Sequence, residues 1–361
     1  MQIEERFFHL LQIAVGQKFN DSIDLSKEEW DAIYELASKQ SLVSVILHAI
    51  DKLNSTSKNL PKCLLLQWIG ESEQIRQRNN YVNQLCAQLS SWFKGRGISC
   101  CILKGQGVAQ LYIHPETRQS GDIDIWVDGN RDEVVRKMLD QSIDVSYVDY
   151  VNCHAGFFTD AEVEVHFRPT WFYNPFVNRR AQKWIEHNKS FQITNYDNNV
   201  GFCYPTIGFN LVFSLIHIYR HIFQEGIGLR QLLDYYYILI HSSTEERSEA
   251  LVTLKSFGLG KFVAAVMFIE RKVFNIDESY TLCSPNVTEG NFLLEEILLG
   301  GNFGHYDDRN SFETNENRWK RGYNNIKRNF RYLKRYPSEV IWMPMWKVWH
   351  WAWRLWKGYL D

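Results

Sequence analysis

The sequence lacks a net charge of either sign. Lysine and arginine total 40 and aspartate and glutamate total 42, which gives a formal net charge of −2 over 361 residues. A chain with this balance has no whole-protein field that would attract nucleic acid or an acidic partner. Any electrostatic function must depend on a local cluster of charges, and we do not expect nucleic acid to be a partner.

Long apolar runs and a secretory signal are also missing. The first residues, MQIEERFFHLLQIAVG, place Glu4 and Glu5 before a short apolar stretch, whereas a signal peptide begins with basic residues. No run approaches the ~18 apolar residues of a membrane-spanning helix. We expect a cytoplasmic protein.

Paired cysteine motifs are absent. The 7 cysteines are odd in number, lie mostly in apolar contexts and include no CxxC pair, which indicates reduced, buried side chains. In contrast, hydrophobic residues make up 45% of the chain and aromatic residues 15%. A chain of this length and composition can bury one large core or two moderate ones.

The hydrophobic period divides the chain into three regions. Residues 1–95 have apolar positions three and four apart, which predicts helices. Residues 96–203 contain short β-branched or alternating runs with two helical stretches between them, which predicts an α/β core with a small mixed sheet. The helical period returns over residues 204–361. The predicted fold is an α/β core between helical N-terminal and C-terminal regions, with no internal repeat.

Two alternating runs in the predicted core carry acidic residues. In DIDIWV (residues 122–127), Asp122 and Asp124 share one face of a strand because side chains alternate with a period of two. In EVEVHF (residues 162–167), the same alternation places Glu164 and His166 on one face.

Three carboxylates on adjacent strands suit phosphoryl or nucleotidyl transfer, because they can hold two Mg²⁺ ions ~3.5–4 Å apart against a nucleotide. An isolated DxD is more often a surface turn or a charged edge, but its neighbours here favour a metal site. We predict that Asp122, Asp124 and Glu164 are catalytic residues that bind Mg²⁺ or Mn²⁺.

The order of motifs adds a family resemblance. A Lys-Gly pair precedes a helix, an arginine precedes a loop, a Gly-Asp-Ile-Asp run follows, and a Glu-Val-His run comes after a second helix: Lys104 and Gly105, Arg118, residues 121–124, and residues 164–166. This order resembles the minimal nucleotidyltransferases of the DNA-polymerase-β-like superfamily, and most closely its bacterial group of uncharacterised nucleotidyltransferases. The resemblance covers residues 98–170 and continues weakly through His217, His221 and residues 228–234.

The resemblance implies an enzyme whose substrate is a nucleoside triphosphate. A hydroxyl of an unknown acceptor, which is a small molecule, a sugar or a protein side chain, would attack the α-phosphate and pyrophosphate would leave. Asp122 and Asp124 would hold the metal ions. Glu164 would be either a further ligand or the base that takes the acceptor's proton, and His166 would orient that carboxylate or contact substrate.

The resemblance also implies how the nucleotide is bound. Gly105 and Gly107 would let the backbone approach the triphosphate at a helix N-terminus, where free N–H groups favour anions. The superfamily usually has Gly-Gly or Gly-Ser at this turn, whereas here Gln106 follows Gly105. Lys104 and Arg118 are therefore expected to supply the phosphate contacts.

Other functions remain open at this point. A degenerate nucleotide-binding or scaffold protein would not need all three acids, although the missing Gly-Ser pair is typical of a drifting site. A metal-dependent phosphohydrolase uses similar carboxylates with water as the acceptor. His217 and His221 have the spacing of a zinc pair on a helix but no HExxH pattern, so we interpret them as interior or pocket-wall histidines.

The C-terminal tail differs in composition from the rest of the chain. From Arg318 to Asp361 it has eleven Lys or Arg residues against two acidic ones, and five tryptophans fall on a helical stripe: Trp342, Trp346, Trp349, Trp353 and Trp356. We expect this helix to dock on the protein's own core, since large aromatic side chains bury well. The alternative is a peripheral helix on an anionic membrane; binding of RNA or single-stranded DNA is less favoured.

Overall fold

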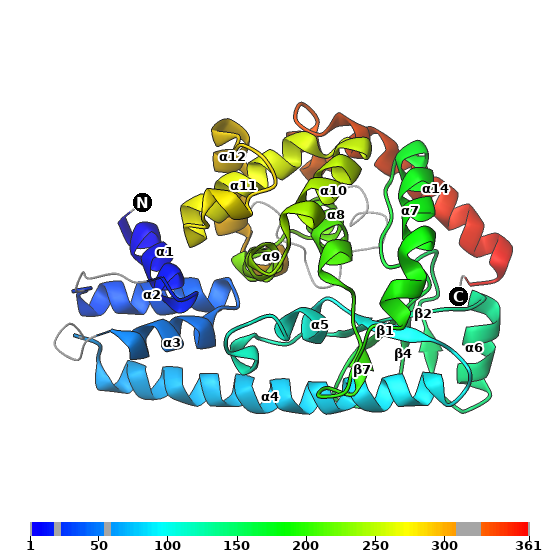
Figure 1. Ribbon diagram of the computed structural model, residues 1–361, viewed down its shortest axis with the longest axis horizontal. Coiled ribbons are helices and arrows are strands. Elements are labelled where there is room, and N and C mark those ends of the chain that lie inside the picture. Colours follow the sequence, from blue (N-terminus) through cyan, green and yellow to red (C-terminus); the bar gives the residue numbers. More distant parts are fainter. Residues whose placement is uncertain (1, 18–22, 54–58, 308–325, 360–361) are drawn as a thin grey trace. The chain divides into compact units, whose positions relative to one another are not determined.

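The computed structural model describes residues 2–17, 23–53, 59–307 and 326–359 (Figure 1). The chain forms two compact units, each assembled from three stretches. Unit 1 comprises Met1–Val82, Val108–Ser120 and Gly226–Tyr306, and unit 2 comprises Asn83–Gly107, Gly121–Glu225 and Asp307–Asp361. Each unit contains residues from all three predicted sequence regions. The predicted domain boundaries therefore stay a prediction.

Unit 2 contains the predicted small mixed sheet. Its five strands lie in the order β1-β2-β5-β4-β3: Cys100–Leu103, Ile123–Val127, Val163–His166, Asn152–Ala155 and Val145–Ser146. The central pair, β2 and β5, is parallel, and the other neighbours are antiparallel. This arrangement confirms the predicted α/β core.

Three helices of unit 2 begin at side-chain caps, and two of them contribute to the core around the sheet. Asn130, Asn174 and Thr206 accept backbone N–H bonds at the starts of α6 (Arg131–Leu139), α7 (Pro175–Ile193) and α8 (Ile207–Gln224), as helix N-caps do. A core cluster joins β1, β2, α7 and α8 through Cys101, Leu103, Trp126, Ile185, Cys203, Phe209 and Phe213.

The shorter elements complete the description. The two-stranded sheet and the one-turn helices are β6 (Tyr196–Asp197), β7 (Phe202–Cys203), α5 (Gly105–Ala109), η2 (Pro115–Thr117), η3 (Glu278–Tyr280), η4 (Asn302–Gly304) and η6 (Phe330–Tyr332). All seven cysteines are free and five of them are buried, as their apolar contexts predicted.

Unit 1 is helical. Its helices are α1 (Gln2–Ala14), α2 (Lys27–Lys39), α3 (Val43–Lys52), the first part of α4 (Lys62–Lys94), α9 (Leu229–Ile240), α10 (Thr244–Ser256), α11 (Gly260–Phe274) and α12 (Val287–Gly300). The helix α2 begins at a capping box in which Ser26 and Glu29 each accept a backbone N–H from the other residue. The helical regions predicted on both sides of the core are confirmed.

The tail helix α14 (Pro337–Lys357) packs on unit 2 through one face. Stacked rings hold it in place. The ring centroids lie 4.0 Å apart for Trp171 and Trp346, 4.4 Å for Trp346 and His350, and 5.9 Å for His350 and Trp353. At the helix start, a buried Glu339 carboxylate accepts the backbone N–H of Tyr173 at 2.8 Å. The predicted docking of the tail is found for this face, although residues 318–325 and 360–361 lie outside the described residues.

The opposite face of α14 is apolar and exposed to solvent. The exposed side chains are Ile341, Met345, Val348, Trp349, Trp351, Leu355 and Trp356. Two of the five tryptophans of the predicted stripe, Trp349 and Trp356, are therefore not shielded. Among the described residues, no helix combines the length and apolar character needed to cross a membrane.

Candidate active site

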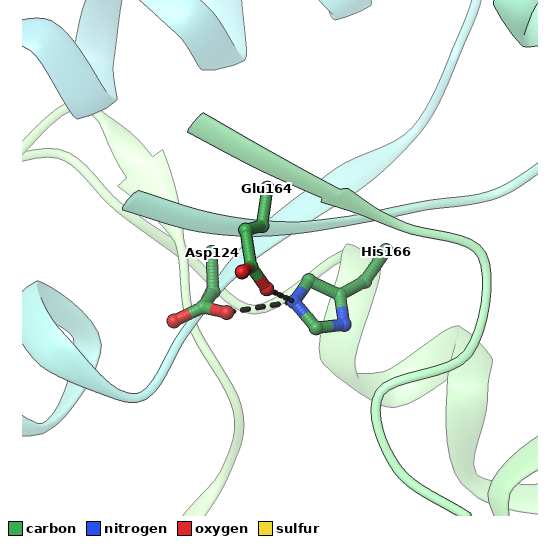
Figure 2. Close-up of side chains that lie close together, drawn as sticks. All are labelled: Asp124, Glu164 and His166. Atoms are coloured by element: carbon green, nitrogen blue, oxygen red, sulfur yellow. Dashed lines mark hydrogen bonds and ion pairs between the residues drawn. The ribbon is translucent and has the colours of Figure 1, made fainter. Parts of the chain in front are cut away.

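The parallel pairing of β2 and β5 brings the predicted acidic residues together. Asp124 lies directly opposite Glu164, and Trp126 lies opposite His166. Because side chains alternate along a strand, Asp124, Glu164 and His166 share one face of the sheet. Figure 2 shows the two carboxylates and the imidazole pointing toward one another.

His166 bridges the two carboxylates. Its Nε2 atom lies 2.7 Å from Asp124 Oδ1 and 3.2 Å from Glu164 Oε2, as the dashed lines in Figure 2 mark. Ligand atoms of these three residues all lie within 4.8 Å of one another. Burial alone would lower the pKa of His166, but the hydrogen bonds and charges of Asp124 and Glu164 raise it to about 9. The two carboxylates therefore favour the protonated imidazole, which donates to them.

Lys104 reaches the same carboxylates from the end of β1. Its backbone has a φ of 47°, and the following Gly105 has a φ of 28°, so the chain turns sharply where the strand ends. The Lys104 Nζ atom lies 2.8 Å from Asp124 Oδ1. Burial would lower the pKa of Lys104, but the charges of Asp124, Asp122 and Glu164 raise it. A left-handed lysine costs roughly 1–3 kcal/mol, and such strain is typical of functional sites.

Asp122 precedes β2 and lies outside the group whose ligand atoms are within 4.8 Å of one another. Its pKa is raised to about 6, first by repulsion from the Asp124 carboxylate, then by burial, while Lys104 opposes the rise. Because Asp122 is exposed to solvent, the repulsion is the main cause. A divalent cation between the two carboxylates would relieve this repulsion.

The charges of the site fit a divalent cation. Burial would raise the pKa of Asp124, but Lys104 and His166 hold it below its usual value. Burial and repulsion by Asp124 would raise the pKa of Glu164, but the hydrogen bond from His166 together with the charges of His166 and Lys104 lowers it. Three carboxylates thus face two cationic groups, which leaves an excess of negative charge among oxygen donors that Mg²⁺ and Mn²⁺ prefer.

Two residues of β4 support Glu164 and were missed in the sequence. Asn152 donates a hydrogen bond to Glu164 Oε2, and His154 Nε2 lies 3.8 Å from Glu164 Oε1. The alternation of residues 152–155 indicates a strand, but only the register, in which His154 lies opposite Glu164, shows that these side chains belong to the site.

Gly107, two residues after Gly105, has a packing role. A Cβ on Gly107 would lie 2.8 Å from the carbonyl oxygen of Ile102 and 3.0 Å from the Tyr204 Cβ, so no larger residue fits there. Gln106 is buried and donates to Asn83 Oδ1 at 2.9 Å, which gives the departure from Gly-Ser a structural reason. The predicted contact of Gly105 and Gly107 with a triphosphate remains a prediction.

Arg118 belongs to unit 1, where it forms a buried bidentate ion pair. Its Nε and Nη2 atoms lie 2.7 and 2.8 Å from the two carboxylate oxygens of Asp234, and the Tyr112 hydroxyl donates to the same carboxylate at 2.7 Å. The structure therefore gives Arg118 a protein partner, and its phosphate contact stays a prediction. Asp234 is the last residue of the stretch 228–234, where the resemblance is weak.

His217 and His221 lie one turn apart on α8 with ring centroids 4.1 Å apart. Burial, followed by the nearby charge of Lys104, lowers the pKa of both imidazoles, that of His221 to about 3. Both rings are therefore neutral at physiological pH and lie close enough to Lys104 to feel its charge. The interpretation as interior or pocket-wall histidines stays a prediction.

A comparison with protein families finds a match that spans the candidate site. The family described as "Uncharacterised nucleotidyltransferase" matches residues 26–275, which include every predicted site residue and exclude α14. No curated protein gives a significant match. The match covers well over half of the 361 residues, and the chain therefore belongs to the uncharacterised nucleotidyltransferase family.

Proposed function

We propose that the protein is a Mg²⁺- or Mn²⁺-dependent enzyme that transfers a nucleoside monophosphate from a nucleoside triphosphate to a hydroxyl acceptor. The observation that carries the proposal is the register of β2 and β5, which places Asp124 opposite Glu164 with His166 between the carboxylates. Family membership supports the reaction class.

In the proposed reaction, the acceptor oxygen forms a bond to the α-phosphorus. The bond from that phosphorus to the oxygen bridging the α- and β-phosphates breaks, and pyrophosphate leaves with the bond's electron pair. The acceptor's proton passes to a carboxylate or to water. A divalent cation would supply Lewis-acid stabilisation of the phosphate oxygens.

The exposure and charge of each residue suggest its role in this reaction. Asp124 is 3% exposed and is fixed by Lys104 and His166, so it suits a rigid metal ligand. The Glu164 side chain is 23% exposed, so solvent and an acceptor can reach it, and it suits either the second ligand or the base. Asp122 supplies the third carboxylate, and Lys104 neutralises charge close to where phosphate oxygens would lie.

A screen of the four labelled nucleoside triphosphates with Mg²⁺ or Mn²⁺ tests the proposal. Pyrophosphate release together with transfer of the α-label to an acceptor or to protein is the expected result. Release of label as free nucleoside monophosphate, or of inorganic phosphate alone, would indicate a phosphohydrolase. Tight nucleotide binding without turnover across candidate acceptors would favour a binding protein.

A further inference from the structure

A polar cavity of about 440 Å³ lies within unit 2, at the end of the sheet where β2 and β5 finish. Residues that follow both strands line it, together with the start of α6, one side of α7 and the end of α14. Its volume is within the ~300–1,000 Å³ typical of small-molecule sites. Trp126 lines the cavity and shares a sheet face with Asp124, two residues earlier in β2.

The cavity lining carries excess positive charge. It includes four cationic residues and two acidic ones, a net charge of +2 for the lining: Arg131, Arg168, Lys189 and Lys357 against Asp132 and Glu186. The two lysines have acidic partners, because Lys189 pairs with Asp128 and Lys357 Nζ lies 3.0 Å from Asp132 Oδ2. Glu186 also lies 3.8 Å from Lys189, so all the neighbouring carboxylates are near the lysines, and, among the described residues, the positive charge without an ion-pair partner belongs to the two arginines.

Both arginines converge on one carbonyl group. Arg131 Nη2 and Arg168 Nη1 donate to the backbone oxygen of Tyr150, at 2.7 and 2.9 Å. Within the described ranges, neither guanidinium forms an ion pair, and the buried Nε of Arg131 has no hydrogen-bond partner. This arrangement differs from Arg118, whose charge is met by the carboxylate of Asp234.

Aromatic rings hold the two guanidinium groups in place. Arg168 lies over the Tyr150 ring at 4.0 Å, and Arg131 lies over the Trp353 ring of α14 at 4.7 Å. Burial, and after it the neighbouring charge of Arg168, lower the pKa of Arg131, so its positive charge is disfavoured in this place. A bound anion would offset the two positive charges and would accept hydrogen bonds from these cavity-lining guanidinium groups.

We infer that this cavity binds a phosphate monoester, and that it holds the phosphate group of the hydroxyl acceptor in the nucleotidyl transfer proposed above. Because both lysines have acidic partners, the charge that would meet a phosphate monoester, roughly −1.5 to −2 at pH 7, is that of the two guanidinium groups. Guanidinium forks match phosphate oxygens in pairs. Two residues along a strand span about 7 Å, so a small acceptor held here can extend a hydroxyl toward Asp124 and Glu164. The acceptor role rests on the proposed function, whereas phosphate binding does not.

Calorimetry with inorganic phosphate tests the binding site in the full chain, with a chelator present and no nucleotide. Arg131→Gln and Arg168→Gln should each weaken phosphate binding at least tenfold. Arg136→Gln changes an exposed arginine on the same helix α6, outside the cavity, and should leave the affinity unchanged. Unchanged phosphate affinity in both cavity variants would overturn the inference.

Further measurements test whether phosphate binds at the carboxylate cluster instead, whether the variants are misfolded, and whether the site prefers a dianion. Lys104→Gln should leave phosphate affinity unchanged, and loss of binding in this variant instead would place the anion at the carboxylate cluster and overturn the cavity site. Arg131→Lys and Arg168→Lys keep the charge but lose the planar fork, so a several-fold loss with an unchanged melting temperature is expected. Acetate, with one charge, should bind at least tenfold more weakly than phosphate; equal affinity would contradict a dianion site.

The acceptor role has its own readout. Once pyrophosphate release is followed with a given acceptor, Arg168→Gln should raise the KM for a phosphorylated acceptor and leave Mg²⁺–nucleotide affinity unchanged. An unchanged acceptor KM together with lost phosphate binding would overturn the acceptor role alone. Absence of any pyrophosphate release by the unmodified protein would count against the proposed function, while phosphate binding to the cavity would still be measurable.

Discussion

The molecule has two charge clusters that are built differently. In unit 1, the two charges of Arg118 and Asp234 match one to one, with both guanidinium bonds made and the Tyr112 hydroxyl donating to the same carboxylate. In unit 2, the carboxylates of Asp122, Asp124 and Glu164 outnumber their cationic neighbours. The first cluster is a closed pair, because each charge is matched within the protein. The second is an open cluster, because a bound cation could balance its excess negative charge.

The difference separates a structural role from a chemical one. A buried pair with matched charge and filled hydrogen bonds gains nothing from a further ion, and breaking it leaves an uncompensated charge. A cluster with excess charge keeps its groups in costly contact, as the raised pKa of Asp122 shows, and a cation relieves that cost. The same reasoning marks Arg131 and Arg168 as a cluster of the second kind with the opposite sign.

The largest expected effect comes from removing charge at the open cluster. Asp124→Asn keeps the shape of a buried side chain but removes a ligand charge, so turnover should fall by ~10³-fold or more and Mg²⁺–nucleotide binding should be lost. Asp122→Asn should have the same direction of effect. The melting temperature should change little, because no core volume is lost.

A matched control for these variants is Asp140→Asn, at the exposed end of α6. It should retain full activity and nucleotide affinity. If calorimetry showed unchanged Mg²⁺–nucleotide affinity in both site variants, the metal assignment would be wrong.

Breaking the closed pair should act on stability. Arg118→Leu leaves the Asp234 carboxylate buried without its cation, and the free energy of unfolding should fall by about 3 kcal/mol. Urea denaturation measures this, and the double variant Arg118→Leu with Asp234→Leu should recover much of the loss. The nucleotide affinity of folded Arg118→Leu decides whether the comparison holds: a loss of ten-fold or more would mean that Arg118 also contacts phosphate, as the family resemblance implies.

Within the open cluster, Glu164 should matter for turnover more than for binding. Glu164→Gln removes one charge but keeps the side-chain shape, so kcat should fall by ~10²-fold while nucleotide affinity stays nearly constant. Glu162→Gln, two residues earlier and exposed, is the control and should behave like the unmodified protein. Equal activity of the Glu164 variant would exclude this residue from the mechanism.

The sequence predicted the open cluster better than the closed one. Alternation in residues 122–127 and 162–167 was enough to place Asp124, Glu164 and His166 on strand faces, because a period of two is a local property. Pairing between strands is not local, so the support from Asn152 required the register. The Arg118–Asp234 pair joins residues 116 positions apart, and nothing near either residue indicates its partner.

The helical regions were predictable for the same reason, and their contacts were not. The aromatic stripe of residues 342–356 predicted a helix with buried rings, and Trp346 does stack on Trp171 at 4.0 Å. Tryptophans surround so much of α14 that the pattern does not show which side is covered; Trp356 is 78% exposed. Gly107 was predicted to approach a phosphate, but its contact with Ile102 depends on how α5 meets β1.

The smallest expected effect concerns a third kind of buried charge, at the start of α14. Glu339 is buried, accepts backbone N–H bonds from Tyr173 and Asn174 at 2.8 and 3.4 Å, and forms no ion pair within the described ranges. Burial raises the pKa of its carboxyl group to about 7, against an ordinary value of 4.5, although both N–H bonds and Arg220 oppose the rise. The folded protein therefore holds this proton more tightly than the unfolded chain does.

The sign of the pH dependence follows from that difference. Between pH 4.5 and 7 the folded state binds more protons at Glu339, so its contribution to stability falls as pH rises through this window and is constant above it. We expect a loss of about 1–2 kcal/mol between pH 5 and pH 8, measured by urea denaturation with tryptophan fluorescence. Glu339→Gln cannot ionise, so subtracting its pH profile removes the other titrating groups. Parallel profiles for the two proteins would show that Glu339 is compensated, and would place it with the closed pair of Arg118 and Asp234.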